Sequence, residues 1–529
     1  MYNYKNLSID VFIQLFVAKN HTRHWGIESP LLLFLPNSHS FTGVDPRPIT
    51  LFNTLGRQLQ TFEPQSPGKA GFYGCGPTVY NFAHIGNLRA YITHDVLVRT
   101  LRRFGYEVTH VMNITDVGHL SSDADEGDDK MVKSAAERGK SVLEVADYYT
   151  QAFFHDTGLL NIQKPTVVCK ATEHVAEMID LIKRIEGNGF TYQAGGNLYF
   201  DISKFPYYGE LALLRLDEQK AGARTGQDEN KRNPGDFVLW FTKSKFENQA
   251  LLWDSPWGRG YPGWHIECSA MSIKYLGETF DIHSGGIDHI PVHHTNEIAQ
   301  SEAATGKHPW VKYWVHNEFL VIDKGKMSKS SGGFLTLQTL IDEGYDPLDY
   351  RYFLLGGHYR SQLQFSYQSL DGARNARKTL GERLRALSAK AANTPGEAAK
   401  AGDSNAADSG AAKYLSAFDK ALEDDLSTPR ALAELWGLLK DQSIAPREAL
   451  DAAFDMDEVL GLNLKEEAAS RPESGEDPAL EAEIKGLIDE RAAAKIAKNF
   501  AKADEIRRNL KDRGIILEDT PAGTVWRKL

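Results

Sequence analysis

The chain has 529 residues, a formal net charge of −11 at pH 7, and 42% hydrophobic residues. This length predicts about three or four domains rather than one hydrophobic core. The longest uninterrupted apolar run, Leu31–Leu35, is far shorter than the ~18 residues of a membrane span, and the acidic balance argues against a protein that binds nucleic acid with its whole surface. The three cysteines, Cys75, Cys169 and Cys268, are too few for a disulfide framework, which predicts a cytoplasmic location.

Residues 1–46 show no sustained hydrophobic period, and we treat them as an N-terminal extension of unknown role. A strand–helix–strand pattern follows: a strand over Gly71–Cys75, a helix that begins near Gly86, and a strand over Tyr106–Ile114. Such a βαβ unit is the seed of a parallel sheet covered by helices. We therefore predict an α/β Rossmann-like catalytic domain over residues 47–345.

The rest of the chain is predicted to be mainly helical. A connective region, mostly helical, is inserted at about 115–208, and strands return at Phe237–Phe241 and Phe280–His283. Residues 346–464 are predicted to form a stem-contact and helical bundle domain, in which the Ala- and Ser-rich stretch 386–412 is a flexible insert. Residues 465–529 are predicted to be a linker and a small C-terminal domain with two amphipathic helices.

One candidate phosphate site lies between the first strand and the following helix, in His84-Ile-Gly-Asn87. A helix N-terminus offers unpaired N–H groups and a positive dipole end, and Gly86 lets a ligand approach the backbone. We predict that Gly86 and Asn87 help to bind a phosphate and that His84 donates to it. On its own, the tetrapeptide is better explained by an ordinary turn histidine.

A second element, Lys326-Met-Ser-Lys-Ser330, follows an apolar run and precedes two glycines. Lys326 and Lys329 are suited to stabilise the charge on a departing pyrophosphate, although a solvated basic turn would look similar. Together and in this order, the two elements resemble the His-Ile-Gly-His and Lys-Met-Ser-Lys-Ser signatures of class I aminoacyl-tRNA synthetases. Asn87 stands where the first signature has its second histidine.

A metal site is suggested by Cys75, Cys268, His293 and Glu297, because thiolate, imidazole and carboxylate form a set that zinc accepts. His293 and Glu297 are four residues apart on an apparent helix start, which puts them on one face. Spacing alone leaves the site open, because the residues are scattered through the chain. We expect the neighbouring His294 to point elsewhere and to take no part.

Longer stretches around these residues resemble cysteinyl-tRNA synthetases: 73–80, 84–87, 263–269, 293–302 and 326–330. The resemblance runs from about Leu51 to the C-terminus. It implies that Cys75, Cys268, His293 and Glu297 hold one Zn²⁺ in the amino-acid pocket, which would select the substrate thiol. Trp264 is a candidate for a wall of that pocket, although an ordinary core tryptophan would look similar. The residues implied to bind ATP with Mg²⁺ are Gly86, Asn87, His283, Gly285, Gly286, Asp288 and Lys329.

The tail is basic, with eleven Lys and Arg against seven Asp and Glu from Ile484 to Leu529. Basic side chains bind phosphates and an aromatic ring can stack on an unpaired base, although a solvated helix face is the simpler explanation. The tail also resembles the anticodon-binding domain of the family. The RNA-binding candidates are Arg491, Lys495, Arg507, Arg508 and Trp526.

We therefore expect a cysteine–tRNA ligase with L-cysteine, ATP and tRNA(Cys) as substrates, present in the cytoplasm as a monomer without membrane contact. A related ligase that joins cysteine to an amino sugar would share the catalytic half but lack the tail. A non-catalytic RNA-binding relative would have no reason to keep His84, both lysines and the four metal ligands. A simple nucleotidyltransferase would not explain the thiol-selective metal set.

Overall fold

We describe a computed structural model that covers residues 46–117, 130–214, 228–243, 251–322, 335–393, 410–470, 478–497, 499–520 and 523–528. The predicted extension 1–46 lies almost wholly outside this part of the chain. The centre of the fold is a five-stranded sheet in which all neighbouring pairs are parallel. In spatial order the strands are β11 (Val311–Asn317), β10 (Phe280–Gly286), β3 (Lys69–Gly74), β4 (Glu107–Ile114) and β5 (Val167–Lys170).

This strand order confirms the Rossmann-like prediction. Numbered along the chain, the five strands run 3-2-1-4-5, so the direction of winding reverses between β3 and β10. In such sheets, ligands bind outside the carboxyl ends of the strands at this switch point. The predicted βαβ unit is present, with its strands at β3 and β4.

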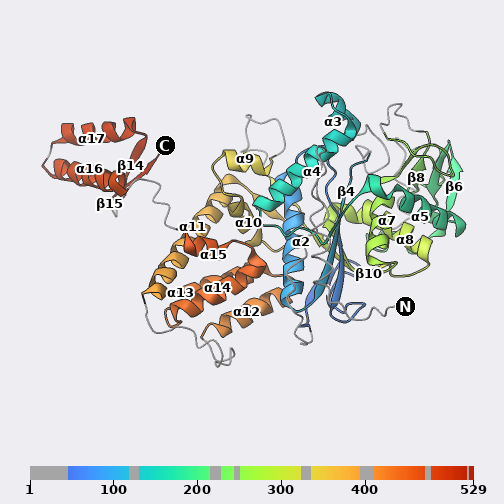
Figure 1. Cartoon of the computed structure of the whole chain (residues 1–529), viewed down its shortest axis with the longest axis horizontal. Coiled ribbons are helices and arrows are strands. Elements are labelled where there is room, and N and C mark those ends of the chain that lie inside the picture. The colour runs from blue at the N-terminus through green and yellow to red at the C-terminus, as the bar shows by residue number, and fades with distance from the viewer. Residues whose placement is uncertain are drawn as a thin grey trace, which may run out of the picture. The chain divides into compact units, whose positions relative to one another are not determined.

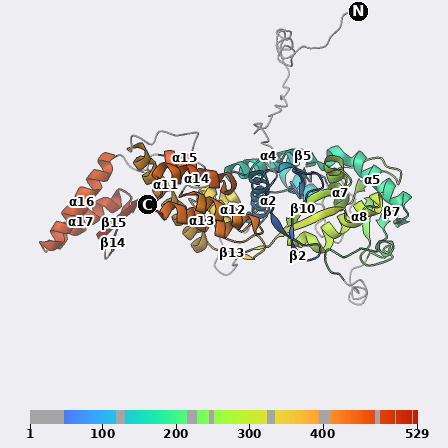
Figure 2. The same cartoon turned by 90° about the horizontal axis from the view of Figure 1, so that it is seen from below.

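Helices cover both faces of the sheet, with α2 on one side and α7 on the other (Figures 1 and 2). Helix α2 begins where predicted, because the side chain of His84 accepts from the Asn87 N–H while the Asn87 side chain accepts from the His84 N–H. Its apolar stripe then packs on the sheet. The helices of this domain are α2 (Ile85–Arg103), α3 (Lys130–Arg138), α4 (Val142–Leu159), α5 (Val175–Gly187), α7 (Trp264–Leu276) and α8 (Thr295–Thr305).

The predicted insertion at 115–208 needs correction at both ends. Strand β5 lies inside that range but belongs to the main sheet, where Val167 pairs with Val111 of β4. A second, antiparallel sheet extends beyond the range, to Pro262. Short strands separated by long helices gave too weak a signal to assign each strand to its sheet. The second sheet consists of β6 (Thr191–Ala194), β7 (Asn197–Phe200), β8 (Phe237–Phe241) and β9 (Tyr261–Pro262).

In the part of the chain that the structure describes, the first two domains also contain two short strand pairs and four short helical turns. The strand pairs are antiparallel β1 (Thr50–Asn53) with β2 (Gln58–Thr61), and parallel β12 (Leu320–Ile322) with β13 (Leu363–Phe365). The turns are η1 (Ala171–His174), η2 (Ile202–Lys204), η3 (Ile287–His289) and η4 (Ile290–His294).

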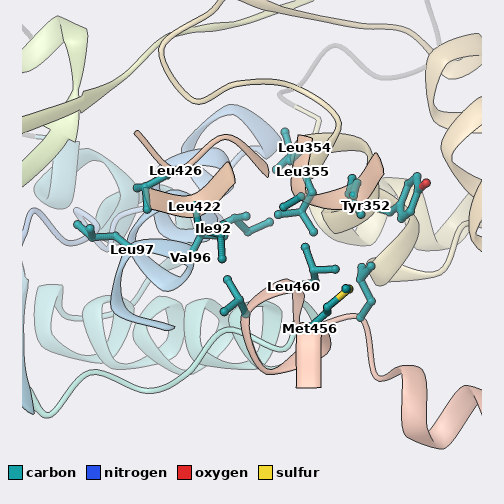
Figure 3. Packing of buried hydrophobic residues seen from close by; sticks show 14 of the residues in the cluster. Ile92, Val96, Leu97, Tyr352, Leu354, Leu355, Leu422, Leu426, Met456 and Leu460 are labelled. Carbon is teal, nitrogen blue, oxygen red and sulfur yellow. The ribbon is translucent and has the colours of Figure 1, made fainter. Parts of the chain in front are cut away.

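A helical bundle packs on α2, as predicted. Ile92 and Val96 of α2 lie against Leu354 and Leu355 of α10, with Leu426 beside them (Figure 3). Helix α11 continues to Ala392, so the predicted flexible insert at 386–412 begins too early; residues 394–409 lie outside the described part. The helices are α9 (Leu337–Asp342), α10 (Pro347–Leu355), α11 (Tyr367–Ala392), α12 (Ala412–Glu423), α13 (Thr428–Lys440), α14 (Pro446–Leu460) and α15 (Leu464–Ala469).

The tail forms a small α/β unit with its own core. Both predicted helices are present, as α16 (Pro478–Ile496) and α17 (Phe500–Asp512), and they are followed by the antiparallel hairpin β14 (Ile515–Thr520) and β15 (Gly523–Lys528). Apolar residues spaced along both helices meet those of the hairpin. The core consists of Ile484, Ile506, Leu510, Ile515 and Leu517.

Candidate active site

The candidate site lies at the switch point of the parallel sheet. The Cys75 N–H donates to the Ser284 carbonyl at 3.1 Å, so the ends of β3 and β10 are joined there. Gly76 follows directly, and a Cβ at that position would lie only 1.7 Å from the Asn113 carbonyl of β4. Glycine is therefore required for the chain to turn away from the sheet beside Cys75.

Four buried side chains bring possible metal ligands together. Cys75, His293, His294 and Glu297 each offer one donor atom, and these atoms all lie within 4.8 Å of one another. His293 Nε2 is 2.6 Å from Glu297 Oε1. A thiolate, imidazoles and a carboxylate in one buried cluster suit zinc. Three of these residues were predicted from the sequence.

The prediction that His294 points elsewhere is wrong. Its Nε2 lies 3.3 Å from Cys75 Sγ, and its Nδ1 is 2.7 Å from His316 Nε2. The physical reason is the π-helical turn η4, which ends at His294 and widens the backbone just before α8. In a regular helix, adjacent side chains point about 100° apart, but a π turn changes this phase and is common at functional sites.

Cys268, from α7, was predicted as a ligand and lies beside the cluster but outside the group of four. The Cys75 thiol is the main cause that lowers the pKa of Cys268 to about 6, against the opposing effect of burial, and His293 also lowers it. The same contact, added to burial, raises the pKa of Cys75 well above its ordinary value. The two thiols are therefore coupled, and their contact favours the thiolate of Cys268 over that of Cys75.

Opposite charges stabilise each other within the cluster. Burial alone would lower the pKa of His293, but Glu297 and Cys268 raise it to about 10. Burial alone would raise the pKa of Glu297, but His293 and His283 hold it below its ordinary value. This cluster is suited to receive a metal ion. Its carboxylate and thiols are buried together, and a cation can displace the protons of the thiols and of His293.

Further side chains orient the ligands. His283 Nε2 lies 2.8 Å from Glu297 Oε2, and His265 Nδ1 lies 3.0 Å from His293 Nδ1. The ring of Trp264 stacks on that of His293, with centroids 4.3 Å apart and planes 3° from parallel. Such outer partners fix the direction of metal-binding side chains.

The predicted phosphate turn lies at the N-terminus of α2. His84 Nδ1 accepts from the Asn87 N–H at 3.2 Å, so a neutral ring carries its proton on Nε2, the atom that would donate to a phosphate. Burial lowers the pKa of His84, which favours the neutral ring, although the negative charge of Asp288 opposes this effect. Asn87, which stands at the fourth position of the signature, completes the helix cap.

The predicted ATP-binding residues of β10 and the following turn η3 separate into two kinds. His283 is fully buried and pairs with Glu297, so it lies beneath the metal cluster rather than on an accessible surface. Asp288 is exposed and acts on His84. A Cβ on Gly285 would lie 2.5 Å from His289 Nδ1 and 2.9 Å from His294 Cε1, so glycine is needed for the histidines to close over the strand end.

Two groups of predicted residues remain. Lys326 and Lys329 lie outside the described residues. In the tail, Lys495, Arg507 and Arg508 are exposed, whereas Arg491 is only 4% exposed and donates to Thr524 Oγ1 at 3.4 Å.

Trp526 packs against the core of the tail and is half-buried. Of the five RNA candidates, Arg491 and Trp526 thus contribute to the interior of the tail. The three exposed cations are the ones placed to reach a partner.

Two family models match the chain. The model described as the class I (C) tRNA synthetase catalytic domain matches residues 61–375, and the model of the cysteinyl-tRNA ligase anticodon-binding domain matches residues 477–527. The first match includes the whole switch-point site, and the second corresponds to the small C-terminal unit.

Individual proteins are similar over most of their length. The cysteine–tRNA ligase of Treponema denticola is 60% identical over 491 residues, which cover 91% of this chain and all of the relative. That of Borrelia hermsii is 44% identical over 478 residues, covering 90% of this chain and 98% of the relative.

A solved structure shares the fold. That of Mycobacterium tuberculosis methionyl-tRNA synthetase in complex with methionyl-adenylate has a TM-score of 0.50 and 16% identity, covering 76% of this chain and 91% of that one. Among the described residues, every helix is too short or too polar to cross a bilayer.

Proposed function

Because the chain belongs to the class I cysteine–tRNA ligase family, we propose that it ligates L-cysteine to tRNA(Cys) and that a bound zinc ion selects the substrate. It is an aminoacyl-tRNA synthetase, and the family uses ATP, an amino acid and tRNA. The observation that carries the zinc proposal is the buried cluster of Cys75, His293, His294 and Glu297 with Cys268 beside it. We further propose that the protein acts as a monomer in the cytoplasm.

The ligands we assign to zinc are Cys75, Cys268, His293 and Glu297. His294 is assigned as an orienting partner, with its Nε2 3.3 Å from Cys75 Sγ and its Nδ1 2.7 Å from His316 Nε2. Zinc binds a thiolate well and an alcohol poorly, so when bound it would favour cysteine over serine. A purely apolar pocket separates such isosteres poorly. Trp264, stacked on His293, would form a wall of this pocket.

Activation joins the cysteine carboxylate to the α-phosphorus of ATP. A carboxylate oxygen forms the new bond to phosphorus as the bond to the bridging oxygen breaks, and pyrophosphate leaves with that electron pair. The Nε2–H of His84 and the N-terminus of α2 stabilise the charge on the phosphate oxygens. Lys326 and Lys329 are proposed to stabilise the pyrophosphate. Gly285, Gly286 and Asp288 line the nucleotide side.

Transfer requires no side-chain nucleophile, because the adenylate is already activated. A ribose hydroxyl of the terminal adenosine of the tRNA attacks the cysteinyl carbonyl, and AMP departs. We propose that Lys495, Arg507 and Arg508 contact the RNA from the anticodon-binding domain. A tRNA substrate, and not an amino sugar, is favoured by the match of residues 477–527 to that domain.

ATP–pyrophosphate exchange tests the activation step. The purified protein should exchange with cysteine and not with serine, and exchange should fall when zinc is removed by a chelator and return when zinc is restored. Charging of tRNA(Cys) should follow. If folded, zinc-loaded protein shows no cysteine-dependent exchange, the ligase proposal is wrong.

A further inference from the structure

The first two turns of α2 hold the chain on both sides of residues 323–334. On the N-terminal side, Arg89 Nη1 donates to the Phe319 carbonyl at 2.6 Å, immediately before β12. On the C-terminal side, the Ile85 N–H donates to the Leu335 carbonyl at 2.8 Å. The helix that begins at the phosphate turn therefore fixes where the chain enters and leaves this segment.

Arg89 also holds the turn that leads into β13. Its Nη2 donates to the carbonyls of Ser361 at 2.6 Å and His358 at 3.1 Å, with a weaker contact to Tyr359 at 3.4 Å. The two segments that Arg89 bridges are themselves paired, because β12 and β13 lie side by side. A single guanidinium thus joins helix, strand and turn.

The charge of Arg89 is unusual because carbonyl oxygens are its hydrogen-bond partners. Only 3% of the residue is exposed, and among the described residues no carboxylate lies within ion-pair distance of it. Burying a charge without a counter-charge is expensive. Arg351, also fully buried, is instead paired with Asp95 at 2.7 Å. The two Nη atoms of the rigid guanidinium donate to carbonyls of different segments, and the single nitrogen of a lysine cannot reproduce this fixed geometry.

Packing around Arg89 keeps its partners in register with α2. Ile92 of α2 meets Leu354 and Leu355 of α10 directly before the Arg89-bound turn (Figure 3). Tyr350 of α10 donates its hydroxyl to the Ile85 carbonyl at 2.6 Å. The turn and α2 are therefore packed together, and Arg89 adds hydrogen bonds from α2 to the carbonyls of the turn.

We propose that Arg89 is a positioning residue for adenylate formation. It fixes β12 on the helix that starts at His84, and so sets the separation between the phosphate turn and the point where the chain leaves β12. This inference rests on the proposed ligase function. It adds a residue that contacts backbone and not substrate, and that acts through the relative placement of two segments.

The test compares Arg89→Lys with Arg351→Lys, a matched change at another buried arginine that caps carbonyls. Because misplacement by about 1 Å can cost on the order of 100-fold in rate, Arg89→Lys should lower kcat for ATP–pyrophosphate exchange by about 10- to 100-fold. The KM for cysteine and the zinc content should stay at the wild-type values, since the metal cluster is untouched. Arg351→Lys should lose stability while it keeps the wild-type kcat for exchange.

A second variant guards against loss of folding. Arg89→Gln leaves no carboxylate unpaired, so it should fold, and its kcat should fall at least as far. Peptide-level hydrogen exchange should show faster exchange at 317–322 and 358–363 in both Arg89 variants. Wild-type kcat in Arg89→Lys, or an equal fall in Arg351→Lys, would overturn the inference. If the wild-type protein shows no ATP–pyrophosphate exchange, the ligase proposal itself is rejected.

Discussion

Among the described residues, two buried polar clusters differ in how fully their hydrogen-bonding atoms are paired. At the junction of α2 with the helical bundle, Asp95 accepts from Arg99, Arg351 and the Gln163 N–H, and Arg351 also donates to the carbonyls of Leu160 and Leu460. The donors and acceptors of this junction are satisfied within the protein. A fully satisfied buried network rigidifies a fold.

At the metal cluster, by contrast, several buried polar atoms lack a hydrogen-bond partner among the described residues, including His283 Nδ1, Ser284 Oγ and His289 Nδ1. Buried groups of this kind require an explanation, because leaving them unpaired costs free energy. The polar atoms of the first cluster are used to join α2 to the helical bundle, whereas those of the second remain available for the proposed zinc ion and substrate.

Removal of a metal ligand should give the largest effect. In Cys75→Ser, we expect zinc affinity to fall by more than about 100-fold, beyond the effect typical of outer partners, and cysteine-dependent exchange to fall with it. Zinc per chain, measured by atomic absorption after dialysis against a chelator, checks this. Cys169→Ser is the matched control, because Cys169 is equally buried but its sulfur contacts the Met112 carbonyl. Equal zinc loss in both variants would show that the loss reflects a general disturbance of the core and not removal of a ligand.

The satisfied junction should respond through stability and not through metal binding. Arg351→Met leaves Asp95 with one arginine fewer in the interior, and breaking a buried ion pair typically costs about 3–5 kcal/mol. Urea unfolding measures this loss, and zinc content should stay at the wild-type level. A loss below about 1 kcal/mol would show that the junction does not hold the two domains together.

His94 of α2 is a further buried side chain whose ring nitrogens lack a hydrogen-bond partner among the described residues, and it makes the comparison testable through pH. Burial is the main cause that lowers the pKa of His94 to about 3, and the nearby His283 and His289 add to it. The unfolded chain, with a pKa near 6.5, therefore binds the proton first, so stability is complete above pH 6.5 and falls as the pH drops towards 3. Between pH 7 and 5, His94 should account for about 2 kcal/mol of lost stability. In His94→Gln, unfolding curves at the two pH values should lie closer together than in the wild type.

The smallest effect we expect is the loss of zinc affinity on substitution of His294. Its size decides whether Cys268 or His294 is the fourth zinc ligand. If Cys268 is the fourth ligand and His294 only orients Cys75, His294→Asn should keep one zinc per chain with about 10-fold weaker affinity. Chelator competition gives the affinity. A loss as large as that of Cys75→Ser would instead make His294 the ligand in place of Cys268.

Local sequence patterns were sufficient for much of the catalytic half. Hydrophobic spacing and capping residues correctly indicated the strand-to-helix turn at His84 and the helix that follows it. The same signals located both helices of the C-terminal unit. Three of the four clustered metal-site residues were predictable because resemblance to a family supplied what spacing could not. The hairpin at the C-terminus and the sheet to which β5 belongs were not predictable, since short strands carry little periodic signal.

The sequence by itself determined the fold class, the family and the chemical types gathered at the site, because these depend on motifs and on the order of elements along the chain. The tertiary structure decided how those side chains meet. The π-helical turn η4 brings His294 to Cys75. The fold places His283 in the interior, where it pairs with Glu297. The packing of α2 beside β12 lets Arg89 bond the Phe319 carbonyl. Each of these depends on atoms distant in sequence and on the phase of a backbone turn, which no local pattern specifies.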